Sequence, residues 1–159
     1  MTAWMKVAAV LVVQLGLVAV GVAPQVSART TGEEYLLRVQ PYDPIDPFRG
    51  AYVDLSYPDL ALNVPDEGDL EADGTTVYLV LREKDGVWVS DGAVTERPDD
   101  GPYLTCDHHS WRLRCGIESY FLPQDQAASF DELVGSGQAV AVVRIDGRGH
   151  AALVDVRSR

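Results

Sequence analysis

Residues that usually carry chemistry are scarce in this chain. It has two cysteines and three histidines, and Lys84 is the one lysine after residue 30. The serines fit no G-x-S-x-G nucleophile elbow, and no glycine-rich loop precedes a helix where it could bind phosphate. The histidines at positions 108, 109 and 150 fall near predicted turns, where a solvated histidine is the ordinary interpretation. We therefore predict no catalytic residue and no cofactor, and we do not expect an enzyme.

Acidic residues are absent from the first 32 positions. All 24 of them lie at or beyond Glu33, where they are accompanied by 11 basic residues. This part of the chain therefore carries a net charge of about −13. Such a surface repels the phosphates of nucleic acid, so nucleic acid is not an expected partner. It would also avoid an anionic lipid surface unless a hydrophobic or covalent anchor held it there.

A hydrophobic anchor is present in the run Val7–Ala23, which has no charge and one polar side chain, Gln14. As a helix this run is about 25 Å long. Adding Ala3–Met5 brings its length close to the ~30 Å hydrocarbon thickness of a bilayer. A buried helix of a soluble protein would normally show a polar face, and this run has none. We predict that residues 1–24 form a transmembrane signal-anchor helix, with residues 3–23 in the membrane.

The end of this helix can be interpreted in two ways. Pro24 is expected to stop it, and residues 25–32 read as a polar tether. Lys6 and the α-amine favour a cytoplasmic N-terminus, which makes the chain a single-pass protein of the cell membrane with its C-terminal domain extracytoplasmic. Alternatively, Val26-Ser27-Ala28 is a small-residue tripeptide of the kind that signal peptidase cuts after, and the domain is secreted after cleavage following Ala28. Both interpretations place residues 30–159 outside the cytoplasm.

The rest of the chain, residues 33–157, reads as one β-rich domain. Asp85-Gly86 indicates a tight hairpin turn, and Asp125–Val134 is the one convincing helical pattern, ended by Gly135 and Gly137. The spacing of the strands predicts a mainly β fold, a small antiparallel barrel or sandwich of about eight strands with one short helix. The predicted strands are Glu34–Gln40, Ala51–Tyr57, Thr75–Arg82, Val87–Ser90, Tyr103–Cys106, Arg112–Leu122, Gln138–Asp146 and His150–Arg157.

Two sequence blocks carry a resemblance to a known family. The first is Gly50-Ala51-Tyr52-Val53-Asp54-Leu55-Ser56-Tyr57, and the second is Cys115-Gly-Ile-Glu-Ser-Tyr-Phe-Leu-Pro-Gln-Asp. On these blocks, in this order, the chain resembles the GDYXXLXY domain family from about Glu33 to Val156. The resemblance implies an N-terminal transmembrane helix ahead of the domain. It transfers no catalytic residue.

The first block departs from the family motif at one position, because Ala51 stands where the motif has aspartate. We interpret that aspartate as a side chain that stabilises the turn entering the strand. Gly50 then supplies an unusual backbone angle, and Tyr52, Leu55 and Tyr57 pack or donate hydrogen bonds.

Cys106 and Cys115 flank a predicted turn near Ser110-Trp111 and would face each other across an antiparallel pair. Opposed Cα atoms in such a pair are about 4.5–5.5 Å apart, within the range that a disulfide spans. We therefore predict a disulfide. The alternative is a zinc site that adds His108 and His109, but neighbouring strand residues point to opposite faces, so we predict no metal.

A second metal interpretation concerns the acidic segment Asp66–Asp73. Its residues Asp69-x-Glu71-x-Asp73 are similar to the start of an EF-hand loop, but Val80 occupies the position of the bidentate glutamate. A solvated acidic loop is the favoured interpretation, with weak calcium binding left open.

These observations favour a membrane-anchored extracytoplasmic binding or accessory module that contacts another membrane or envelope protein. The candidate interaction loop contains two Asp-Pro turns, at Asp43 and Asp46, with Phe48 and Arg49 at its tip. An aromatic side chain beside arginine is common at protein interfaces, although Phe48 could equally pack in the core.

Two other functions stay open from the sequence. One is a small-ligand or glycan-binding barrel, or a weak hydrolase, with a pocket lined by Tyr52, Tyr57 and carboxylates. The other is a purely structural component of the envelope.

Overall fold

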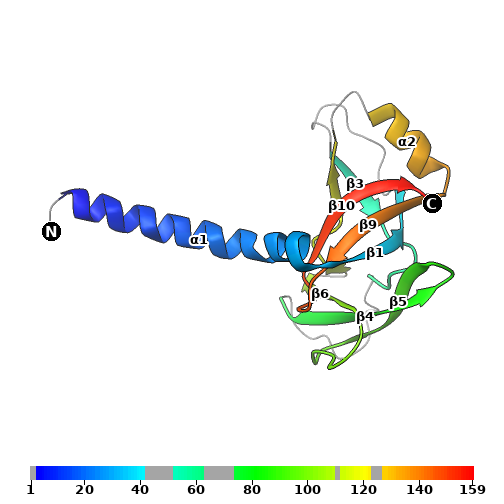
Figure 1. Ribbon diagram of the computed structural model, residues 1–159, viewed down its shortest axis with the longest axis horizontal. Coiled ribbons are helices and arrows are strands. Elements are labelled where there is room, and N and C mark those ends of the chain that lie inside the picture. The colour runs from blue at the N-terminus through cyan, green and yellow to red at the C-terminus, as the bar shows by residue number, and fades with distance from the viewer. Residues whose placement is uncertain (1–2, 42–51, 63–73, 110–111, 123–126) are drawn as a thin grey trace.

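The computed structural model describes residues 3–41, 52–62, 74–109, 112–122 and 127–159 (Figure 1). A long helix projects from a β domain, and every paired strand is antiparallel, so the predicted mainly β class is confirmed. The elements in chain order are α1 (Ala3–Thr31), β1 (Glu33–Arg38), β2 (Gln40–Pro41), β3 (Tyr52–Ser56), β4 (Thr76–Lys84), β5 (Val87–Val94), β6 (Tyr103–His109), β7 (Arg112–Arg114), β8 (Ser119–Phe121), α2 (Ala127–Gly135), β9 (Ala139–Ile145) and β10 (Ala151–Ser158).

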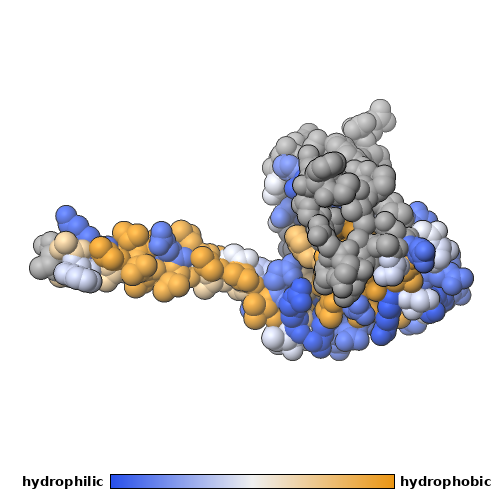
Figure 2. Space-filling view, turned by 90° about the horizontal axis from the view of Figure 1, so that it is seen from above, coloured by the Kyte–Doolittle hydropathy of each residue, from blue (hydrophilic) through white to orange (hydrophobic). Residues whose placement is uncertain are grey.

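Helix α1 is long and apolar enough to cross a membrane, and the most apolar part of it is not buried by the domain. Figure 2 shows apolar side chains along most of the projecting helix and a largely polar surface on the described part of the domain. An exposed apolar helix is therefore joined directly to a domain with a largely polar surface.

The expectation that α1 ends at Pro24, followed by a tether over residues 25–32, is wrong. The helix continues through Pro24 to Thr31. Proline removes one helical hydrogen bond and costs about 3 kcal/mol inside a helix. Here the last turn of α1 packs against β9 and β10, and Ala28 becomes fully buried. The free energy gained by this tertiary contact outweighs the tendency of proline to end a helix.

The strands form three sheets, with the orders β1-β9-β10, β2-β3-β8 and β5-β4-β6-β7. All three contribute fully buried side chains to one core, for example Leu37 of β1, Leu55 of β3 and Leu79 of β4. The β4–β5 hairpin turns at Asp85 and Gly86, with φ of 53° and 76°. Positive φ at both central residues is what a type I′ turn requires, so the predicted turn is confirmed.

The single strand predicted for residues 112–122 is wrong, because the chain forms β7 and β8 in two different sheets. β7 pairs with β6, whereas β8 pairs with β3. Between them the backbone turns at Gly116, where φ is +79°. Apolar residues alternate at positions 113, 115 and 117, across this turn, which is why the sequence does not reveal the change of partner strand.

Candidate functional site

The two sequence blocks that carry the family resemblance lie side by side as strands β3 and β8. Their register pairs Tyr52 with Phe121, Val53 with Tyr120 and Asp54 with Ser119. The backbone N–H of Leu55 donates to the carbonyl of Glu118 at 2.7 Å and extends the pairing by one step. We call this β3–β8 pair the motif ribbon.

The inner side of the motif ribbon belongs to the core. Leu55 and Tyr57 are 2% and 3% exposed. The Tyr57 hydroxyl donates to the carbonyl oxygen of Ile117 at 2.6 Å, which joins the first block to the second. Burial, with a further contribution from the negative charge of Glu118, raises the pKa of Tyr57, so this hydroxyl stays protonated. The expectation that Tyr57 lines a ligand pocket is therefore wrong, since its ring is enclosed by the core, while the side chain of Tyr52, the other tyrosine expected there, lies outside the described residues.

The other side of the motif ribbon carries two exposed side chains, Ser119 and Phe121, and the half-buried Asp54. Ser119 Oγ donates to Asp54 Oδ1 at 3.1 Å across the two strands. Next to this pair Phe121 is 77% exposed. A large aromatic side chain that stays mostly exposed on a paired strand is a common anchor at protein interfaces. The arrangement suits binding, because it combines an apolar anchor with one carboxylate and one hydroxyl.

The turn that leads into β8 is fixed by Glu118 and by a disulfide. The Glu118 carboxylate accepts the backbone N–H groups of Cys115 at 2.5 Å and of Gly116 at 3.0 Å. Cys115 is bonded to Cys106, with their Cα atoms 4.1 Å apart, so the structure contains the predicted disulfide. The register that places them opposite is confirmed by the pair Asp107 with Arg114. The zinc alternative is wrong, since both thiols are used by the bond.

Replacing Cys106 and Cys115 together with alanine is expected to lower the free energy of unfolding by about 2–3 kcal/mol. The disulfide closes a short loop and restricts the unfolded chain by that amount. Urea unfolding of both proteins, oxidised and fully reduced, measures the difference. The variant should match the reduced wild-type protein, and an unchanged midpoint after reduction would contradict the expected contribution.

The second cluster of polar side chains joins α1 to the closing hairpin of β9 and β10. The Asp146 side chain is 3% exposed. Ser27 of α1 donates its hydroxyl to Asp146 Oδ2, and His150 Nδ1 lies 3.0 Å from the same oxygen. The backbone N–H groups of Arg148 and His150 donate to Asp146 Oδ1 at 2.8 and 3.1 Å. We call Ser27, Asp146 and His150 the junction cluster.

The junction cluster contains the residue types of a Ser-His-Asp catalytic triad, but their spatial order is not that of a triad. In a triad the imidazole lies between the hydroxyl and the carboxylate and removes the proton of the hydroxyl. Here the carboxylate of Asp146 lies in the middle and accepts from both partners. Burial tends to raise the pKa of Asp146, but the hydrogen bonds from Ser27, Arg148 and His150 outweigh it and lower the pKa. The cluster therefore holds α1 to the domain rather than activating a nucleophile.

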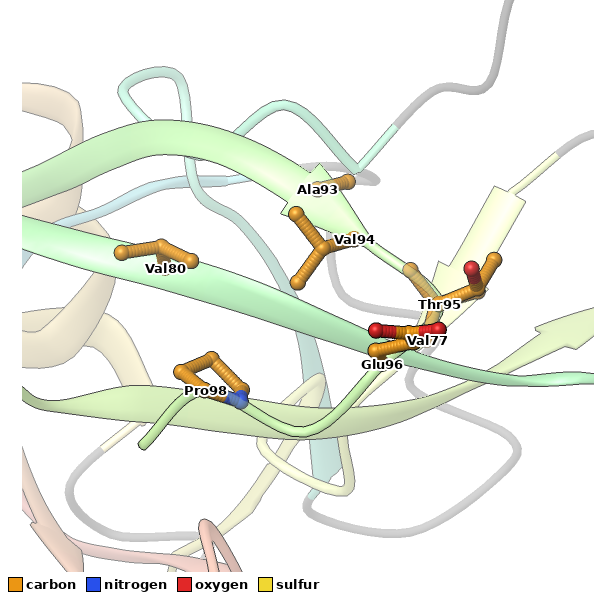
Figure 3. A pocket seen from close by; sticks show the side chains of 7 residues that line it. All are labelled: Val77, Val80, Ala93, Val94, Thr95, Glu96 and Pro98. Atoms are coloured by element: carbon orange, nitrogen blue, oxygen red, sulfur yellow. The ribbon is translucent and has the colours of Figure 1, made fainter. Parts of the chain in front are cut away.

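Two hollows are found on the described surface. One, of about 440 Å³, lies between the end of α1, β1 and β6, and Asp146 of the junction cluster lines it together with Glu33, Tyr35 and Tyr103. The other, of about 580 Å³, is an apolar groove along β4 and β5. Figure 3 shows its lining side chains, among which Glu96 carries the charge, and the lining residues are Val77, Val80, Ala93, Val94, Thr95, Glu96 and Pro98. The groove has the surface to hold apolar side chains and lacks a nucleophile paired with a base.

The predicted site residues divide into those that the structure describes and those that it does not. The interaction-loop residues Asp43, Asp46, Phe48 and Arg49 and the motif residues Gly50 and Ala51 lie outside the described residues, as does the acidic segment 66–73. The backbone of Tyr52 begins β3, where it pairs with Phe121. Among the described residues, no group of three or more His, Cys, Asp or Glu side chains is placed to hold a metal ion.

Sequence reasoning missed Phe121, the Asp54–Ser119 pair and the junction cluster. It also treated His108 as solvated, and this is wrong, since His108 is 7% exposed on β6. Phe121 gave no local signal, because an apolar residue in a short strand is expected in the core. The junction cluster joins residues 119 positions apart, Ser27 and Asp146, and no local pattern reveals such a contact.

Comparison with known proteins agrees with the resemblance. The family model described as GDYXXLXY protein matches residues 14–156, which begins inside α1 and ends within β10. No curated protein and no solved structure matches the chain. The match includes both sequence blocks of the motif ribbon and nearly the whole domain, so the chain belongs to the GDYXXLXY protein family.

Proposed function

We propose that this protein is a membrane-anchored extracytoplasmic module that binds another membrane or envelope protein. The observation that carries the proposal is the joint between α1 and the β domain. Ala28 is fully buried, the Ser27 hydroxyl is held by Asp146, and Arg29 donates to the carbonyl of Leu153 at 3.2 Å. The apolar helix therefore continues into the domain as one body.

This joint supports a retained anchor over cleavage after Ala28. Such a cut would remove Ser27 and Ala28 from the sites where the folded domain holds them. It would leave the buried Asp146 carboxylate without one of its donors, and an unsatisfied buried group costs about 1–3 kcal/mol. A segment that is only a signal peptide has no reason to be built into the packing of the mature domain.

The disulfide supports an extracytoplasmic domain. Cys106 and Cys115 are bonded and buried, at 1% and 6% exposure. Structural disulfides persist in oxidising compartments outside the cytoplasm and are rare inside it. A cytoplasmic N-terminus with the domain on the other side of the membrane agrees with this chemistry.

The motif ribbon is the surface that we assign to the partner. The part of α1 beyond the apolar run, residues 24–31, is held against the domain through Ser27 and Ala28. No flexible linker therefore separates the apolar run from the domain, and the motif ribbon is held at a fixed orientation to the membrane, which suits a module that docks on a neighbouring protein. Phe121 supplies the apolar anchor of the contact.

Replacing Phe121 with alanine is expected to reduce recovery of the partner at least tenfold while leaving the domain folded. The side chain is 77% exposed and lies outside the buried core, so its removal should cost the fold little, whereas a central aromatic anchor contributes about 2 kcal/mol or more to binding. Crosslinking and co-purification from native membranes measure the recovery. Val94→Ala is the control, because Val94 is 41% exposed on β5, in a different sheet from the motif ribbon. Equal recovery with both variants would exclude the motif ribbon as the contact surface.

A further inference from the structure

We propose that α1 also binds its partner inside the membrane, through a face defined by Gln14 and Gly21, and that the bound group is a transmembrane helix of a different protein. This inference rests on the proposed function, since it requires that α1 is retained in the membrane. The feature that suggests it is the one polar side chain of the apolar run, Gln14.

Gln14 lies near the middle of the run Val7–Ala23, about 10 Å along the helix from its start. Its amide is too far from either interface to reach water, and a buried amide without hydrogen-bond partners is costly in hydrocarbon. The neighbouring side chains on α1 are apolar and cannot supply partners. A donor and an acceptor must then come from a second transmembrane segment.

Gly21 lies on the same face of α1 as Gln14. At 3.6 residues per turn, a spacing of seven residues separates two side chains by about 20° around the helix, and Val18 lies between them along the axis. A Cβ added at Gly21 would meet nothing within 4 Å in this structure, so the glycine is not required by the protein's own packing. A small residue beside a polar one lets a second helix approach closely enough to bond with it.

The domain argues against a second copy of the chain as the bound helix. The last turn of α1 is fixed to β9 and β10 by the junction cluster, so the domain cannot swing aside. Figure 1 shows described parts of the domain on both sides of the axis of α1. Packed helices lie about 8–10 Å apart, whereas a domain of this size has a radius of gyration of about 14 Å. A parallel second copy whose helix touched Gln14 from either of these two sides would bring the two domains into the same space.

The partner helix is thereby defined by its chemistry. It carries a side chain that both donates and accepts hydrogen bonds, such as Ser, Thr, Asn, Gln or His, at the depth of Gln14. It also has no bulky extracytoplasmic domain on the contacting side, because the β domain of this chain occupies that space. A polytopic membrane protein with short outer loops meets both conditions.

The test uses the full chain in native membranes, with a photo-crosslinking amino acid at position 18 on the Gln14 face or at position 12 on the opposite face. We expect a heterologous adduct from position 18 only. Gln14→Leu should lower its yield about three- to tenfold. The double variant Gln14→Val with Val12→Gln should lower it equally, although it keeps the composition and moves the amide to the other face.

Two glycine variants form a matched pair for the same measurement. Gly21→Leu adds bulk on the Gln14 face and should abolish the adduct. Gly16→Leu adds the same bulk about 160° away from Gln14, and should leave it unchanged. A Cβ at either glycine meets nothing within 4 Å, so neither variant is expected to disturb the chain itself.

Three results would overturn the inference: an adduct with lipid alone, an adduct with a second copy of this chain, or a yield unaffected by Gln14→Leu. Intact mass of the membrane-extracted protein separates this failure from failure of the proposed function. A chain lacking residues 1–28 would remove the retained anchor, and with it both proposals. A full-length chain whose adduct yield is unchanged by Gln14→Leu would overturn the inference and leave the proposal of docking through the motif ribbon intact.

Discussion

Replacing Asp146 with alanine is expected to lower the free energy of unfolding by about 3 kcal/mol and to release the end of α1. The carboxylate accepts hydrogen bonds from the Ser27 hydroxyl, from two backbone N–H groups and from His150. Its removal leaves these donors without an acceptor at a nearly closed site. Each buried donor that loses its acceptor costs about 1–3 kcal/mol. Urea unfolding of the full chain in detergent, followed by circular dichroism, measures the loss.

Release of the helix can be followed separately with trypsin. Arg29 lies in the last turn of α1, where its side chain bonds to the carbonyl of Leu153, so the wild-type protein should resist cleavage there. Asp146→Ala should be cut after Arg29 much faster than wild type under native conditions. His150→Ala, which removes one side-chain hydrogen bond from the junction cluster, is the milder control. Wild-type resistance in Asp146→Ala would show that the junction cluster does not hold the helix.

The same carboxylate predicts how stability depends on pH. Its pKa in the folded protein is lowered, because the hydrogen bonds outweigh the effect of burial. A carboxyl group whose pKa is lower in the folded protein than in the unfolded chain stabilises the fold at pH values above its unfolded pKa of about 3.9. This stabilisation is lost as the pH falls through the pKa of the folded protein. Asp146→Asn should therefore flatten the loss of stability below about pH 4. An unchanged acid profile in that variant would mean that Asp146 does not contribute there.

Replacing Gly32 with alanine is the second change with a large expected effect, a loss of about 2 kcal/mol or more from overpacking. Gly32 follows α1, and its N–H donates to the carbonyl of Ala28 at 3.0 Å. An added Cβ would lie 2.4 Å from that carbonyl oxygen and 2.9 Å from the backbone of Ile145. All three contacting atoms are backbone, so either α1 or β9 has to move. The expected result is a less stable protein in which Arg29 is also exposed to trypsin.

Gly147→Ala is the matched control for Gly32→Ala. A Cβ at Gly147 meets nothing within 4 Å. Both substitutions restrict the unfolded chain to a similar extent, which stabilises by about 0.4–1 kcal/mol, so the difference between them isolates the clash at Gly32. Equal midpoints in urea would show that the helix and the domain can move apart far enough to relieve the 2.4 Å contact without loss of stability.

Local patterns predicted the parts of this fold that depend on neighbours in sequence. The Asp85-Gly86 turn follows from two residues that tolerate positive φ, and the disulfide follows from two cysteines placed symmetrically about a turn. The break between β7 and β8 escaped prediction, since Arg112–Arg114 and Ser119–Phe121 have similar local preferences and differ only in the strand that each pairs with. Pairing partners distant in sequence leave no local trace.

The sequence by itself determined the apolar helix, the β class of the domain, the disulfide and the family, because length, alternation and motif spacing are properties of the chain before it folds. The tertiary structure alone decided where α1 ends and what the motif does. Packing of Ala28 and the bonds of Ser27 and Arg29 carry the helix past Pro24, against the preference of that residue. The pairing of β3 with β8 turns Tyr57 into the core and leaves Phe121 mostly exposed. Both outcomes depend on contacts between distant segments, whose energies exceed the local preferences that a sequence displays.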